Sequence, residues 1–275
     1  MCLTCGCGDE ENVRVSTMDA HGDGHGHDHD HDHSHGHGHD HHHGCAHPRL
    51  DPVDHHLHEA ARTEKLVLGE QILAKNDQLA DHNRAWLLER AITTVNVMSS
   101  PGSGKTSLLE RTIAELQSSR EICVIEGDQE TLFDAQRIKD AGARAVQVNT
   151  GAGCHLDAPM VQQAIEALAP SNGSLLFVEN VGNLVCPALF DVGEHAKVVI
   201  ISVTEGDDKP LKYPHMFRAA DLVVINKTDL LPYVDFDLDK LAKQARSLNP
   251  GVEIISLSVR SGENLDSWYA WLGAL

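Results

Sequence analysis

The residues that most constrain this chain are the eight from Ser99 to Thr106, which read Ser-Ser-Pro-Gly-Ser-Gly-Lys-Thr. They follow an apolar, β-branched run at 92–98 and lead into a helical pattern. A strand, a glycine-rich turn and a helix in this order are typical of a phosphate-binding P-loop, in which backbone N–H groups and a helix N-terminus surround an anion. The chain is therefore predicted to bind a nucleotide with Gly102, Ser103, Gly104, Lys105, Thr106 and Ser107.

Carboxylates at two strand ends complete the predicted phosphate site. Lys105 is expected to reach the β- and γ-phosphates, and the Thr106 hydroxyl is expected to bind Mg²⁺. That ion needs further oxygen ligands, and Asp128 and Glu179 follow apolar strand-like runs. One of these two carboxylates is expected to orient the attacking water. The predicted catalytic residues are Lys105, Thr106, Asp128 and Glu179.

Strand and helix patterns alternate from Ile92 to the end of the chain. This alternation predicts an α/β fold of the P-loop NTPase type, with a mostly parallel sheet of about seven strands flanked by helices. A closing helix is expected at 264–275 and a loop at 230–235. The predicted strands are 93–98, 122–126, 145–149, 174–179, 197–203, 222–226 and 253–258.

A helical pattern at 64–91 precedes the first of these strands. Its apolar residues form a stripe, which is expected to pack on the domain that follows. With this leading helix, the nucleotide-binding domain is predicted to span 61–275. The stripe has two adjacent tracks, one of Ile72, Leu79 and Trp86 and one of Leu73, Ala80 and Leu87.

The tetrapeptide Asn226-Lys227-Thr228-Asp229 ends the predicted strand 222–226. The Asp229 carboxylate can accept hydrogen bonds from N1–H and the N2 amino group of guanine, whereas adenine has no such pair of donors. Lys227 is expected to lie over the base plane and Asn226 to tie the base loop to the P-loop. Ser258 is expected to support the loop around the guanine O6 atom. GTP and GDP are therefore the predicted nucleotides, and an ATP-dependent small-molecule kinase is disfavoured.

The first 60 residues differ from the rest in composition. They hold 12 Asp and Glu against 2 Lys and Arg, and the whole chain has a net charge of −19. Residues 21–47 contain 13 histidines, mostly alternating with Gly or Asp, and lack the apolar residues that a core needs. Segment 8–60 is therefore expected to be disordered. Imidazoles suit Ni, Zn and Cu, so the segment is interpreted as a metal buffer or store, with a solubilising linker as the alternative. The histidines are His21, His25, His27, His29, His31, His33, His35, His37, His39, His41, His42, His43 and His47.

Six of the seven cysteines lie outside any predicted strand, and Cys123 is interpreted as a small buried apolar residue. Cys2, Cys5 and Cys7 form a thiolate-rich motif in residues 1–7, to which Ni(II), Zn(II) or Cu(I) could bind. The pair Cys154-His155 and the later Cys186 lie in loops at the expected nucleotide edge. They predict a second metal site, completed by another ligand or shared between two chains.

The chain has no signal-peptide pattern, basic cluster or apolar run of about 20 residues. A cytoplasmic location is expected, in which thiols stay reduced. Neither nucleic acid nor membrane insertion is expected.

Together these motifs resemble the HypB family of hydrogenase nickel-incorporation GTPases, over residues 1–7 and from about 64 to the C-terminus. The resemblance rests on the Cys-x-x-Cys-Gly-Cys start, the P-loop, Glu126-Gly127-Asp128-Gln129, Cys154-His155-Leu156-Asp157, the 179–187 loop and the guanine motif. A histidine-rich insert occurs in some members of this family.

The resemblance implies a slow GTPase that acts as a nickel metallochaperone and dimerises with GTP. It also implies a companion accessory protein and delivery of Ni(II) to the large subunit of [NiFe]-hydrogenase. In such a protein Cys2, Cys5 and Cys7 would form the N-terminal nickel site. Cys154, His155 and Cys186 would form the metal site of the nucleotide domain.

Two alternatives remain. A urease-accessory nickel GTPase carries Cys-x-His, whereas Cys154 and His155 are adjacent here. A nickel-storage protein with a minor GTPase role would not need nucleotide hydrolysis, so GTP turnover distinguishes it.

Overall fold

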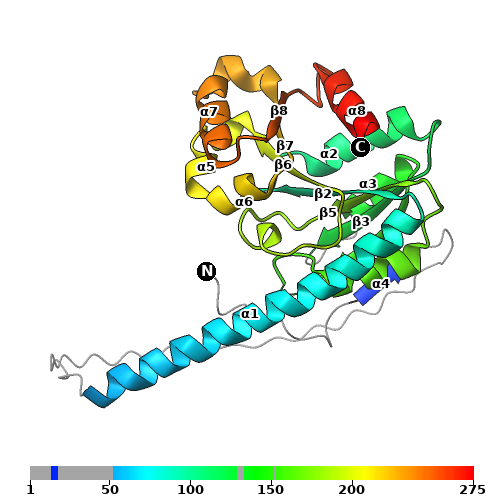
Figure 1. Cartoon of the computed structure of the whole chain (residues 1–275). Helices are drawn as coiled ribbons and strands as arrows, with labels where there is room; N and C mark the ends of the chain where they lie inside the picture. The colour runs from blue at the N-terminus through cyan, green and yellow to red at the C-terminus, as the bar shows by residue number, and fades with distance from the viewer. Residues whose placement is uncertain (1–13, 18–51, 129–132, 152) are drawn as a thin grey trace, which may run out of the picture. The chain divides into compact units, whose positions relative to one another are not determined.

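The computed structural model describes residues 14–17, 52–128, 133–151 and 153–275 (Figure 1). The predicted ligands Cys2, Cys5 and Cys7 and the histidines at 21–47 lie outside the described residues. The described residues fall into two compact units that divide the long helix α1 (Pro52–Glu89) after Gly69. In this part of the chain, no helix has both the length and the apolar character that crossing a membrane requires.

The larger unit is built on one sheet with the strand order β1-β4-β3-β5-β2-β6-β7-β8. All seven predicted strands are present as β2 to β8, and every neighbouring pair among them is parallel, which confirms the predicted α/β fold. The strands are β1 (Arg14–Thr17), β2 (Thr93–Ser99), β3 (Ile122–Asp128), β4 (Arg144–Asn149), β5 (Leu175–Glu179), β6 (Ala196–Ser202), β7 (Leu222–Asn226) and β8 (Glu253–Ser256).

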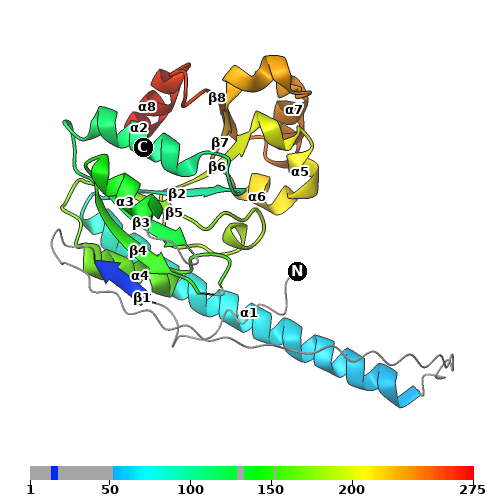
Figure 2. The same cartoon turned by 180° about the vertical axis from the view of Figure 1, so that it is seen from behind.

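The segment 8–60, for which the sequence predicts disorder, contains strand β1 and the start of helix α1. Strand β1 pairs antiparallel with β4 at one edge of the sheet (Figure 2). Its four residues are too few to show the alternation of apolar and polar residues that predicts a strand. Backbone pairing with the edge of β4 makes them a strand instead. Helix α1 begins at Pro52 rather than near 64, which suits a proline because the first helical N–H needs no intrahelical partner.

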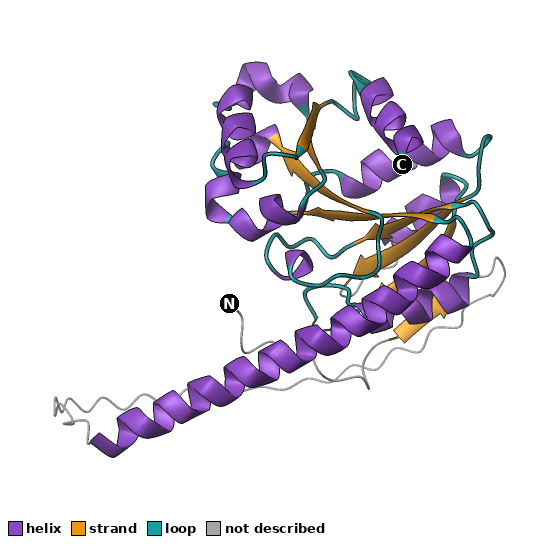
Figure 3. Cartoon of the chain, viewed as in Figure 1, coloured by secondary structure: helices purple, strands orange, loops and turns teal. Residues whose placement is uncertain are grey.

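Helices lie on both sides of the sheet (Figure 3). One face packs against α2 (Lys105–Leu116), α3 (Phe133–Asp140) and α8 (Leu265–Ala274). On the other face, α1 and α4 (Ala158–Leu168) cover β3, β4 and β5, while α6 (Pro214–Ala219) and α7 (Leu238–Leu248) cover β6 and β7. Cys123 lies inside this second layer and is fully buried, as predicted, and burial raises the pKa of its thiol to about 12. The remaining short elements are α5 (Lys209–Lys212) and the 3-10 turns Cys186–Ala188, Val203–Glu205 and Thr228–Tyr233.

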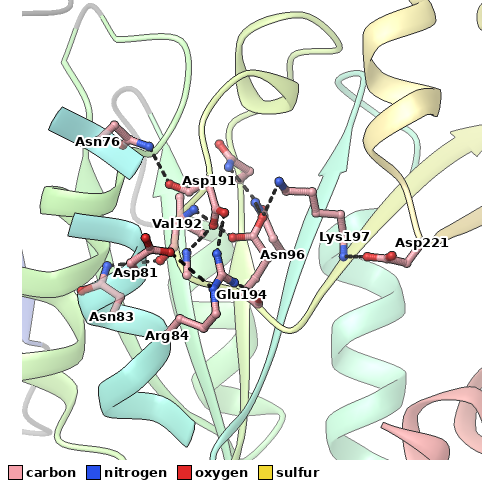
Figure 4. Close-up of polar contacts among 12 residues, drawn as sticks. Asn76, Asp81, Asn83, Arg84, Asn96, Asp191, Val192, Glu194, Lys197 and Asp221 are labelled. Carbon is pink, nitrogen blue, oxygen red and sulfur yellow. Dashed lines mark hydrogen bonds and ion pairs between the residues drawn. The ribbon is translucent and has the colours of Figure 1, made fainter. Parts of the chain in front are cut away.

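Polar side chains, as well as apolar ones, attach the second half of α1 to the body (Figure 4). Of the two predicted tracks, Ala80 and Leu87 are fully buried, whereas Ile72 is 48% exposed. Asn76 and Asn83 lie on the same buried side. The Asn83 amide donates to the carbonyl oxygens of Ala158 (2.9 Å) and Val192 (3.1 Å). These contacts tie α1 to the start of α4 and to the loop before β6.

The Asn83→Ala variant is expected to lose about 1–3 kcal/mol of unfolding free energy, because two buried carbonyl oxygens lose their donor. Urea unfolding of the full chain measures this loss. Asp81→Ala, on the exposed side of the same helix, removes only a 4.0 Å surface ion pair and is expected to cost below about 1 kcal/mol. Equal stability of both variants would show that the Asn83 hydrogen bonds do not hold α1 in place.

Candidate nucleotide site and metal centre

A cavity of about 510 Å³ opens at the carboxyl ends of β2, β3 and β5. In open parallel sheets this edge is where ligands bind. The predicted residues that line it are Gly102, Gly104, Lys105, Thr106, Ser107, Asp128, Glu179 and Lys227. The other predicted residues do not line it: Ser103, Asn226 and Ser258 are buried, and Asp229 accepts a hydrogen bond from Ser258.

The P-loop turn is held by the base-recognition motif. Gly104 has φ 101° immediately before α2, and a Cβ atom there would lie 2.6 Å from the Asn226 amide nitrogen. That amide donates to the Ser103 carbonyl oxygen (2.9 Å), which is the tie between the two loops that the sequence predicts. Only glycine tolerates both this φ and this close approach.

Two lysines point their ammonium groups at the turn. Lys105 Nζ donates to Ser99 Oγ (3.0 Å), and Ser99 is the residue that replaces the usual first glycine of the motif. Lys227 Nζ donates to the Gly102 carbonyl oxygen (2.7 Å). Both ammonium groups therefore contact the 99–106 turn, and the position of Lys227 over the base plane stays a prediction.

Asp229 is oriented by Ser258. The Ser258 hydroxyl donates to Asp229 Oδ1 (2.6 Å) and accepts from the Ser261 backbone N–H (3.1 Å). The Ser258 hydroxyl therefore joins the Asp229 carboxylate to the loop that follows β8, and its expected role around guanine O6 stays a prediction. One oxygen of Asp229 is thus fixed while the half-buried side chain keeps capacity to accept from a base.

The cavity also carries charged groups for which the sequence predicts no role. Thr106 Oγ1 donates to Glu179 Oε1 (2.7 Å), and burial raises the Glu179 pKa against the opposing effects of Lys105 and Thr106. Glu126, to which no role was assigned, also lines the cavity and is only 3% exposed. Burial, followed by repulsion from Glu179 and Asp128, raises its pKa to about 9.

Arg137 is a second residue that the sequence analysis missed. Its guanidinium donates to Ser107 Oγ (3.2 Å) and pairs with Glu110 (2.7 Å) at the cavity wall. It lies on the short helix α3, where a single Arg among charged residues has no distinctive pattern in the sequence.

The Cys-His-Cys group predicted from loops is assembled in the structure. The ligand atoms of Cys154, His155 and Cys186 all lie within 4.8 Å of one another. His155 is 6% exposed and packs against the ring of Phe190, with centroids 3.9 Å apart. Burial lowers the His155 pKa to about 4, so its imidazole is neutral at neutral pH, the form that binds metals, and its Nδ1 lies 3.6 Å from Cys154 Sγ. Two sulfurs and one imidazole suit Zn²⁺ or Ni²⁺ and leave a coordination position open.

A buried asparagine links this Cys-His-Cys group to the nucleotide cavity. Asn180 directly follows Glu179, and its Oδ1 accepts from the backbone N–H of Leu156 (3.0 Å), next to His155. Its amide donates to Asn96 Oδ1 (3.3 Å) in the central strand β2. The segment that holds Cys186 therefore begins at the nucleotide cavity.

Comparison with known proteins agrees with this geometry. The family model "CobW/HypB/UreG, nucleotide-binding domain" matches residues 93–256. The hydrogenase maturation factor HypB of Azotobacter vinelandii is 54% identical over 221 residues, which cover 80% of this chain and 73% of that protein. The Escherichia coli K12 hydrogenase maturation factor HypB is 45% identical over 286 residues, covering 99% of this chain and 98% of that one.

A solved structure shows the same likeness in three dimensions. The crystal structure of Helicobacter pylori HypB in complex with nickel superposes with a TM-score of 0.67 at 39% identity, covering 72% of this chain and 93% of that one. Sequence, fold and the paired nucleotide and thiol sites thus lead to one assignment: the chain belongs to the HypB family of hydrogenase maturation factors.

Proposed function

We propose that this chain hydrolyses GTP to GDP and phosphate and acts as a nickel metallochaperone in hydrogenase maturation. The observation that carries the proposal is the shared segment 179–186, which begins at the phosphate cavity and ends at a Cys-His-Cys metal centre. A simple nucleotide-binding protein does not need that metal centre, and a simple metal store does not need the cavity. The relative from Helicobacter pylori, solved with nickel, supports Ni²⁺ as the cargo.

In this proposal the chain's own residues prepare the phosphates for attack by water. Lys105 and the P-loop N–H groups neutralise charge that develops on the β- and γ-phosphates. Thr106, Asp128 and Glu179 fit a divalent cation, because Glu179 Oε2 is buried in the cavity wall without a hydrogen-bond partner among the described residues. Mg²⁺ held by Thr106, Asp128 and Glu179 would offset the negative charge of the phosphates. Asp128 or Glu179 orients the water that attacks the γ-phosphorus.

The metal roles follow from donor chemistry. Cys154, His155 and Cys186 bind Ni²⁺ or Zn²⁺ in the nucleotide domain. Cys2, Cys5 and Cys7, in the motif of residues 1–7, are proposed as a separate nickel site, and the histidines of 8–60 as a store. Residues 61–275 form the GTPase domain in this scheme.

The proposed partners follow from the family. They are a second copy of this chain in the GTP-bound state, a companion nickel-maturation accessory protein and the large subunit of [NiFe]-hydrogenase, met in the cytoplasm. Storage with a minor GTPase role is the second candidate, favoured by the 13 histidines at 21–47.

Deletion of residues 21–47 tests both candidates at once. The deletion is expected to remove most of the nickel bound per chain and to leave GTP hydrolysis at the full-chain rate. Since free imidazole has a pKa of about 6.5, nickel held by the histidines should be released as pH falls through that value. Metal analysis and phosphate release measure the two quantities. Absent GTP turnover in the full chain would contradict the chaperone proposal, and unchanged nickel content would contradict the store.

A further inference from the structure

Glu126 occupies a core position in the strand pattern of β3. Ile122 and Val124, the two preceding residues on its side of the strand, pack in the core beneath α2. On the neighbouring strand β5 the same is true of Leu175 and Phe177, and the next residue in that alternation is Glu179. Glu126 and Glu179 are direct partners in the parallel register. Two carboxylates therefore lie side by side where each strand would otherwise continue with an apolar residue.

Neither carboxylate is fully satisfied. Each has one oxygen, Oε2, that is buried without a hydrogen-bond partner among the described residues, and each residue is 3% exposed. A buried carboxylate without a partner is costly, and a second one beside it adds repulsion. Lys105 acts on both groups, but its Nζ donates to Ser99. Both glutamates line the nucleotide cavity, and their unused oxygens are buried in its wall.

The oxygen donors that line the cavity suit a cation. Its lining holds four acidic residues, Glu126, Asp128, Asp134 and Glu179, against three basic ones, Lys105, Arg137 and Lys227. A nucleoside triphosphate brings further negative charge. Mg²⁺ and Mn²⁺ prefer oxygen ligands, which both the carboxylates and the phosphates offer.

We infer that the Glu126 carboxylate contributes, together with Glu179, to binding the divalent cation that accompanies the nucleotide. This inference rests on the proposed GTPase function and adds to it a residue beyond Thr106, Asp128 and Glu179. Glu126 contacts the cation and neither the base nor the metal centre at Cys154. Its replacement therefore weakens binding of the cation and leaves the preference for guanine unchanged.

The test is a titration of the full chain with Mn²⁺, with and without GDP, followed by the electron paramagnetic resonance signal of free Mn²⁺. Glu126→Gln is expected to weaken the GDP-dependent Mn²⁺ site by about 10–100-fold, while GDP affinity without divalent cation stays equal or rises. Its melting temperature at neutral pH without the ion should not fall, because burial raises the Glu126 pKa to about 9, so the ion-free carboxyl is already protonated and Gln has nearly the same shape. Glu126→Asp keeps the charge and should retain part of the affinity.

The matched control is Glu194→Gln, because Glu194 is also a buried carboxyl (5% exposed) but does not line the cavity. It should leave Mn²⁺ affinity unchanged. Wild-type Mn²⁺ affinity in Glu126→Gln, in a preparation whose wild type hydrolyses GTP, would overturn this inference alone. A wild-type chain that neither binds nor hydrolyses GTP would overturn the proposed function itself.

Discussion

Asp229→Asn is expected to weaken GTP binding by about 30–800-fold and to create measurable binding of xanthosine triphosphate. The loss corresponds to about 2–4 kcal/mol for a charge-assisted pair of hydrogen bonds to the guanine N1–H and N2 amino group. Xanthine carries a carbonyl at position 2, which accepts a hydrogen bond from the new Asn amide. Calorimetric titration with both nucleotides measures the exchange of specificity.

Two further variants serve as controls for this prediction. Ser258→Ala removes the hydroxyl that donates to Asp229 Oδ1 at 2.6 Å, so it should weaken GTP binding less than Asp229→Asn and create no new base preference. Asp235→Asn changes an exposed aspartate six residues away and should have no effect. Full GTP affinity in Asp229→Asn would exclude guanine recognition by this residue.

Metal affinity at Cys154, His155 and Cys186 is expected to differ by about 5–150-fold between the GDP-bound state and a state with a non-hydrolysable GTP analogue. Coupling free energies between two sites are commonly about 1–3 kcal/mol. The physical link is short, because Glu179 lines the nucleotide cavity, Asn180 accepts from the Leu156 N–H, and Cys186 follows six residues later. Segment 180–186 also passes close to the P-loop, since a Cβ atom on Gly182 would lie 3.1 Å from Pro101. Linkage is reciprocal, so bound metal should shift the preference between GTP and GDP by the same factor.

Nickel titration checks this coupling in a chain lacking 21–47 and with Cys2, Cys5 and Cys7 replaced by Ser. Asn180→Ala should reduce the difference between nucleotide states, because it removes the side chain that joins β5 to the metal loop. Cys186→Ser should weaken nickel by more than about 100-fold, since even outer partners of a metal site are worth 10–100-fold. Cys123→Ser, at a buried cysteine remote from the site, should leave nickel affinity unchanged. Equal nickel affinity in both nucleotide states would mean that hydrolysis does not drive metal release.

Most of the nucleotide site could be predicted from the sequence because its parts are local. The turn at 99–106 needs its glycines for backbone geometry, and the 226–229 motif is one short loop after a strand. Prediction of the metal centre also required an argument about the sheet, because its ligands come from two separate loops. Cys186 is 31 residues beyond His155, yet both follow strands of a parallel sheet, and the carboxyl ends of such strands share one edge.

Only the tertiary structure shows which polar residues lie on buried faces. Asn76 and Asn83 interrupt the apolar stripe of α1, and in sequence they look like solvent-facing residues. Glu126 likewise looks like the end of a strand, although it continues the core side of β3. Strand β1 carries too little sequence for a pattern and depends on the edge that β4 offers. In each case the deciding quantity is the environment of a side chain or backbone group, and that environment is made by residues distant in sequence. Periodicity and local motifs therefore determined the strands, the P-loop and the base motif, whereas packing alone determined which polar groups are buried and what they contact.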